Sequence, residues 1–320
     1  MNSKRVGVSF LLLVLIHYMV VFGLTAYYIA APEGKEIGIV ENLILSQMIN
    51  IVPVALVILI GRGKYRQEKI FTDILGFRRV KISTILMTVL YTFLLMPLTT
   101  LANAISMIFV DNTVANLAGD ILNVPFVIMF LVMAVFGPFF EEVVFRGAFY
   151  RGFRRSGNIF GAVLMSGLLF ALMHMNFNQA AYALLLGIMM ALLAEAAGST
   201  VVTFIMHLVF NGQSVCLMYL EDRFFSDILE EGLENYSYTS EEMMMVIAVY
   251  LLLAVVCTAI AFCVVTWIAS NEGKQNFLRT IWASRKWGRE RIWSVCLIIG
   301  IFLSVAYMTV EAVAEYIMRT

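Results

Sequence analysis

Nine long apolar runs constrain the fold of this 320-residue chain more than any other feature of its sequence. A helix needs about 20 consecutive apolar residues to cross the hydrocarbon core of a bilayer. A single span must be helical, because lipid offers no partner for an unpaired backbone group. The expected spans are 6–30, 38–61, 82–108, 123–145, 158–175, 179–197, 199–219, 242–268 and 293–314. The predicted fold class is an all-α polytopic membrane protein with about nine transmembrane helices.

The composition agrees with a chain that lies almost wholly in the membrane. Hydrophobic residues make up 61% of it and charged residues 14%, where a soluble domain has roughly 25% charged residues. Residues 1–320 are therefore expected to form a single integral membrane domain. The four cysteines show no C-x-x-C spacing, so the sequence suggests neither a disulfide framework nor a zinc–thiolate site.

The basic residues predict the orientation of the chain, since cytoplasmic loops carry an excess of Lys and Arg. Of the 22 basic residues, 19 fall in four segments that nine spans would place on one side. These segments are 4–5, 62–81, 146–155 and 274–291. The prediction is an inside N-terminus and an outside C-terminus, in a cell membrane. The acidic stretch 221–241 is then an external segment, either an amphipathic cap or a solvated loop.

Three ionisable residues interrupt the fourth span. A charge at the bilayer centre costs at least ~2.5–3.5 kcal/mol, and such a residue is by default a candidate functional site. Glu142 and Arg146 stand four residues apart, so they can pair on one helix face. Glu141 lies about 100° round the helix. We interpret Glu142–Arg146 as an orienting pair and Glu141 as the reactive carboxylate, suited to act as a general base.

The fifth span brings a histidine to the depth of this carboxylate. If 156–158 is the turn of a helical hairpin, Glu141 precedes it by about 15 residues and His174 follows it by about 17. At 1.5 Å per residue, the two lie roughly 23 and 26 Å from the turn. They could therefore hold one water molecule between them.

The seventh span adds His207 and Asn211, which share a helix face and could donate two hydrogen bonds to one oxygen, as an oxyanion site requires. Both could instead only bridge helices. A further alternative is a metal such as zinc, held by Glu141, His174 and His207, since two histidines and a carboxylate form a known catalytic zinc site.

Together these residues resemble the three motifs of the CPBP family, the CAAX prenyl protease and bacteriocin-processing proteins, also called the Abi family. The motifs are Glu141-Glu142-x-x-x-Arg146, Phe170-x-x-x-His174 and His207-x-x-x-Asn211, in order on successive apolar helices. The resemblance covers roughly residues 122–220. It implies a catalytic core of four consecutive helices.

The resemblance also implies an intramembrane endopeptidase that cuts a hydrophobic or lipidated peptide or protein. By match to the motifs, Glu141 would activate water with the help of His174, while His207 and Asn211 would stabilise the oxyanion. A glutamate mechanism and a metal-dependent one both remain open for the family. The expected partners are the bilayer and the substrate, and not nucleic acid. The alternatives are a non-catalytic scaffold or immunity protein and a proton-coupled transporter.

Overall fold

The computed structural model describes residues 2–30, 37–61, 69–233, 240–287 and 291–319. Every regular element in these ranges is a helix. The α-helices are α1 (Ser3–Ala30), α2 (Ile39–Ile60), α3 (Ile82–Ser106), α4 (Thr113–Asn116), α5 (Ala118–Leu122), α6 (Phe126–Met129), α7 (Gly137–Glu142), α8 (Arg151–Arg154), α9 (Ile159–Leu172), α10 (Phe177–Ala197), α11 (Val201–Leu233), α12 (Ser240–Asn271), α13 (Phe277–Ser284) and α14 (Val295–Arg319). Three π-helical stretches join them: η2 (Ile70–Ile74), η3 (Phe130–Phe136) and η4 (Val143–Tyr150).

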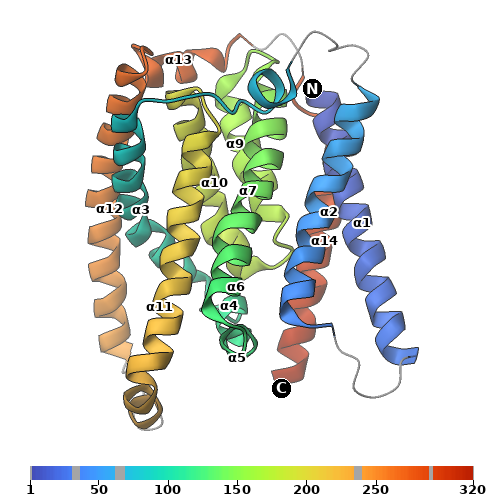
Figure 1. Ribbon diagram of the computed structural model, residues 1–320, viewed down its shortest axis with the longest axis vertical. Helices are drawn as coiled ribbons and strands as arrows, with labels where there is room; N and C mark the ends of the chain where they lie inside the picture. The colour runs from blue at the N-terminus through green and yellow to red at the C-terminus, as the bar shows by residue number, and fades with distance from the viewer. Residues whose placement is uncertain (1, 31–36, 62–68, 234–239, 288–290, 320) are drawn as a thin grey trace.

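The long helices form a bundle whose axes run roughly parallel (Figure 1). Eight helical segments in the described ranges are long and apolar enough to cross a membrane. One of them, Phe126–Arg154, is a composite rod made of α6, η3, α7, η4 and α8. The predicted class, an all-α polytopic membrane protein, is confirmed.

The fifth expected span, 158–175, differs from the prediction. It forms α9, which has 14 residues and ends at Leu172, so it is shorter than a full crossing requires. Met175 follows with a positive φ of 55°, and Asn176 then caps the start of α10. A short helix is tolerated at this place because α9 packs closely against α10, which supplies contacts that a lipid-facing span would lack.

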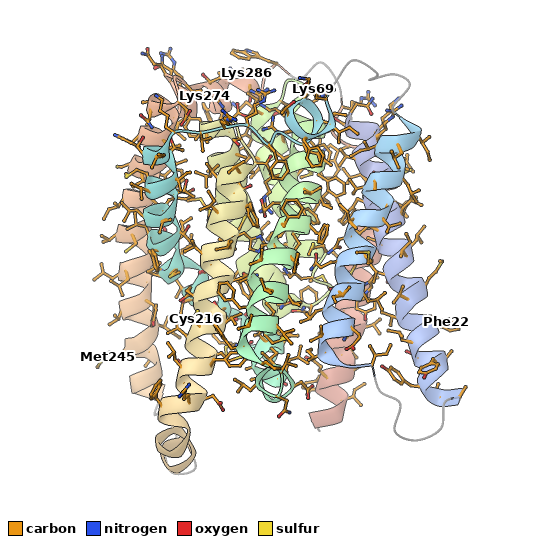
Figure 2. All side chains as sticks on the ribbon, in the orientation of Figure 1. Phe22, Lys69, Cys216, Met245, Lys274 and Lys286 are labelled. Carbon is orange, nitrogen blue, oxygen red and sulfur yellow. The ribbon has the colours of Figure 1, made fainter. Side chains whose placement is uncertain are left out.

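The two ends of the bundle differ in charge. The N-terminus lies at the same end as Lys69, Lys274 and Lys286, which we call the basic end (Figure 2). The C-terminus, α4 and α5 lie at the opposite end (Figure 1). The short helix α9 still leads away from the basic end and α10 returns to it. Within the described ranges the chain therefore alternates direction as nine segments, of which eight have full length.

The outer surface of the bundle suits lipid. Large apolar side chains are exposed along α1, α12 and α14, for example Phe22 (77%), Leu252 (66%) and Phe302 (69%). At the basic end, the exposed Trp282 of α13 is followed by the exposed Trp287. Tryptophan is enriched at the membrane–water boundary, so α13 marks an interface there.

An ion pair between the exposed Arg154 and the buried Glu195 closes the basic end of the bundle. Glu195, near the end of α10, accepts two hydrogen bonds from Arg154 at 2.6 and 2.8 Å and a third from Tyr150 at 2.5 Å. Lys274 Nζ donates to the backbone oxygen of Glu195. Burial lowers the pKa of Lys274, and the Glu195 carboxylate opposes that shift.

The connection before α3 is hydrogen-bonded to the same end of the bundle. Arg151 donates to the backbone oxygens of Gly76 and Gly198 at 3.4 and 3.1 Å. The Thr200 hydroxyl donates to the oxygen of Leu75 at 2.6 Å. Gly76 and Gly198 both have φ of +73°, which favours glycine. Together with the contact of Lys274, these hydrogen bonds join four chain segments across the basic end.

The acidic segment 221–241 begins as an extension of the bundle. The backbone of α11 continues to Leu233 at the opposite end, and α12 begins at Ser240. Residues 234–239 lie outside the described ranges. The placement of this segment outside the cell stays a prediction.

Candidate active site

The composite rod changes its helical pitch on both sides of the glutamate pair. The π-helical η3 ends where the Gly137 N–H donates to Val132, five residues back. In the same register, the oxygen of Met133 would receive the N–H of residue 138, which is a proline and has none. The Asn211 side chain fills this gap, because its Nδ2 donates to Met133 O at 3.0 Å. A missing backbone hydrogen bond therefore orients one of the predicted site residues.

Glu142 and Arg146 form the predicted ion pair. Arg146 Nη1 donates to Glu142 Oε1 at 2.8 Å, and both side chains are fully buried. Arg146 also lies over the ring of Phe170, with its guanidinium carbon 4.1 Å from the centroid. Such a cation–π contact gains strength away from water. The pair is thereby held from its own helix and from α9.

His207 joins this pair from α11, which sequence spacing did not indicate. Its Nδ1 lies 3.0 Å from Glu142 Oε1, and its Nε2 lies 3.7 Å from Glu141 Oε2. Because a carboxylate accepts, Nδ1 carries the hydrogen and Nε2 is the nitrogen left for Glu141 or a bound molecule. One imidazole thus connects both glutamates, and Glu142 orients it.

Glu141 occupies the boundary between the buried cluster and a cavity. It is 9% exposed, and its Oε1 accepts a hydrogen bond from Gln47 Nε2 at 3.0 Å. Gln47 belongs to α2 and also faces the cavity, while its own Oε1 is buried without a partner. The predicted reactive carboxylate is therefore held by an amide that is in none of the three motifs.

His174 lies at the turn where α9 ends. Its Nδ1 is 2.8 Å from the oxygen of Phe170, so on a neutral ring Nδ1 carries the hydrogen and Nε2 keeps its lone pair. Asn176 holds the turn by donating to the oxygen of His174 at 2.8 Å. Glu141 and His174 line the same cavity, and their equal depth stays a prediction.

Close packing of α9 on α10 sets the position of this turn. A Cβ on Gly187 would lie 2.8 Å from the Cα of Gly167, which is closer than real Cβ contacts come. Only glycine lets the two backbones approach in this way. Phe170 then contacts His174, His207 and Phe145 edge-to-face, with centroids 5.1, 5.7 and 5.4 Å apart. This aromatic ring fills the space between the two histidines.

The cavity beside these residues has a volume of about 650 Å³. Its charged or titratable lining consists of Glu141, His174, His207, His17 and Tyr182, with no Lys or Arg among the described residues that line it. The remaining polar groups are amides and hydroxyls, for example those of Asn50, Asn103 and Gln179, set among apolar side chains. Such walls suit an uncharged, largely apolar peptide stretch.

All six residues that the sequence singled out are thus brought into one region. Four of them, Glu141, His174, His207 and Asn211, line the cavity, while Glu142 and Arg146 lie behind it. Gln47 is the residue that sequence reasoning missed. The available signal was an amide within an apolar helix, with the second amide of Asn50 one turn further along.

The expected metal ligands do not form a ligand group. Among the described residues, no three His, Cys, Asp or Glu side chains are arranged to hold a metal ion. Glu141 already accepts from Gln47, and the Nδ1 of His207 is engaged by Glu142. The arrangement of Glu141, His174 and His207 does not fit a metal centre.

The fold and the site define a polytopic membrane protein with a buried Glu–Arg–His cluster at the wall of an intramembrane cavity. Residues 123–213 match the family model described as type II CAAX prenyl endopeptidase, Rce1-like. This match confirms the resemblance to the CPBP family of CAAX-type proteases, for the segment that carries the cluster. The family that this segment matches is one of proteases. Comparisons with curated proteins and with solved structures gave no match.

Arg146→Ala should destabilise the folded protein by about 3–5 kcal/mol, because the buried carboxylate of Glu142 would lose its main countercharge. Thermal unfolding in detergent measures this loss, together with the yield of folded protein. Arg279→Ala is the matched control, since Arg279 is exposed on α13. A melting temperature equal to that of the wild type for Arg146→Ala would show that the pair is not structural.

Proposed function

We propose that this protein is an intramembrane endopeptidase in which Glu141 activates a water molecule to attack a peptide bond. The observation that carries the proposal is the position of Glu141, which is held by Gln47 and His207 at the wall of the cavity. The neutral walls of the cavity support a hydrophobic or lipidated peptide as the substrate. The family match supports the same reaction class.

In the first step, Glu141 takes a proton from water while the water oxygen bonds to the scissile carbonyl carbon. His174 positions the water through Nε2, since its Nδ1 is bound to Phe170 O. The carbonyl oxygen becomes an oxyanion. In the second step the C–N bond breaks, and the proton held by Glu141 passes to the leaving nitrogen. Each step needs only water and the peptide, so the atoms balance.

Two donors face the developing oxyanion in this scheme. His207 offers Nε2–H when both of its ring nitrogens carry hydrogen, and Glu142 holds the ring through Nδ1. Asn211 offers the second hydrogen of its amide, because Met133 O engages the first. Donors that are fixed before the reaction stabilise the charge without reorganisation. Glu142, Arg146 and Met133 act here as positioning groups.

Glu141→Gln should abolish cleavage and leave folding and peptide binding unchanged, because the amide keeps the shape of the side chain and cannot accept the proton. The measurement is release of product from a library of hydrophobic and lipidated peptides by the purified protein in detergent. Peptide binding without cleavage by the wild type would favour a non-catalytic scaffold. Substrate movement across vesicles without hydrolysis would favour a transporter.

Asn211→Ala should lower kcat by about 10²–10³ with little change in KM, since the donor acts in the transition state. The same change should cost about 1–3 kcal/mol of stability, because Met133 O loses its partner. Rates are therefore compared well below the unfolding temperature of the variant. A rate loss that matches the unfolded fraction alone would remove Asn211 from the mechanism.

Gln47→Met should lower kcat/KM for peptide cleavage, because Glu141 loses the amide donor that holds it at the wall of the cavity. The measurement is the rate of product release at substrate concentrations below KM. Ser46→Ala is the matched control on the same helix, since the Ser46 hydroxyl donates to Leu43 O and not to Glu141. A kcat/KM equal to that of the wild type in Gln47→Met would reduce Gln47 to a packing role.

A further inference from the structure

The cavity extends from the catalytic cluster toward one end of the bundle only. Beyond Asn211, its wall on α11 continues through Ser214 and Leu217, which are both exposed. It also includes Asn112 and Val114, in the connection that follows α3 at the opposite end. No described residue from the connections at the basic end lines it. The cavity therefore has its mouth at the end opposite the basic loops.

The basic end is closed by packing as well as by its ion pair. All eight residues of η4, which lead from the glutamates toward that end, are buried. Phe149 and Phe153 are fully buried, and the contacts of Glu195 and Arg151 lie beyond them. A peptide arriving at this end would have to break several hydrogen bonds, among them the buried one from Tyr150 to Glu195, before it reached Glu141.

The distribution of basic residues indicates which end of the bundle faces the cytoplasm. Among the described residues, most Lys and Arg side chains belong to segments at the basic end, and excess Lys and Arg in short loops marks the cytoplasmic side. The exposed tryptophans of α13 support a membrane boundary at the same level. The cavity mouth then faces away from the cytoplasm.

We infer that the substrate is a peptide chain that reaches the site from the extracytoplasmic side, as an exported or membrane-inserted chain does. This inference rests on the proposed function. Its consequence is that a prenylated C-terminus in the cytoplasm has no path to Glu141. In this view the four-helix core determines which reaction takes place. The orientation of the whole chain in the membrane determines which peptides can reach the site.

The first experiment locates the mouth without using activity. Ser214→Cys places a thiol on the cavity wall near the mouth, and Thr280→Cys places one on the exposed face of α13 at the basic end. Each variant is treated with a membrane-impermeant maleimide in sealed right-side-out and inside-out vesicles, with the wild type as blank. Ser214→Cys should be labelled only in right-side-out vesicles and Thr280→Cys only in inside-out vesicles.

The reverse pattern would overturn the inference, and so would labelling of Ser214→Cys in neither vesicle type but only after solubilisation in detergent. The label on Ser214→Cys should also be slowed by a peptide that binds the cavity. These outcomes are the same whether or not the protein cleaves peptides.

The second experiment uses a cleavable peptide tethered to a soluble carrier, so that it cannot cross the membrane. Product should form when the peptide is supplied outside right-side-out vesicles and not outside inside-out vesicles. Cleavage from the inside-out side alone would overturn the inference and leave the proposed function standing. Absence of cleavage from both sides and in detergent would count against the proposed function, and the labelling pattern would still decide the direction of the cavity.

Discussion

The buried carboxylate of Glu142 is the group on which the rest of the site depends. A charge in the bilayer interior is costly unless it is paired and hydrogen-bonded, and Glu142 receives Arg146 from its own helix and His207 from α11. Arg146 in turn reaches the oxygen of Gly187 on α10 and the ring of Phe170 on α9. One ion pair therefore holds all four helices of the core in register.

Irregular helical geometry provides the second part of the arrangement. A regular α-helix uses every interior carbonyl within itself, whereas η3 followed by Pro138 leaves Met133 O for Asn211. π-helical turns are frequent at functional sites for this reason. The backbone hydrogen bond that the rod lacks at Met133 O is replaced by one from the Asn211 amide. This hydrogen bond also fixes the amide in the site. The same rod thus presents the reactive carboxylate and orients one of its proposed partners.

The segments outside the family match contribute to what the site can do. Residues 123–213 hold the cluster, but Gln47 comes from α2, and the wall of the cavity also includes residues of α1 and α3. The closed basic end likewise depends on Lys274, which follows α12. In our proposal the shared core carries out the hydrolysis, while these added helices decide which peptide can approach and from which side.

The sequence by itself determined the class of fold, the approximate positions of the spans and the pair Glu142–Arg146. A single segment that crosses lipid must be helical, because its backbone groups have no other partners there. Residues four apart lie on the same face of a helix, whatever surrounds them. It also placed Glu141, His174, His207 and Asn211 in one region, through their motifs. The first three inferences needed only composition and distances along the chain, whereas the last also needed the family resemblance.

Only the tertiary structure decided that His207 bridges both glutamates, that Gln47 holds Glu141, and that Met133 O holds Asn211. It also decided that α9 stops at Leu172 and that the cavity opens at one end. Contacts between helices depend on the rotation of each helix about its axis and on its depth. Neither quantity is fixed by sequence spacing, because both follow from how all the helices pack together.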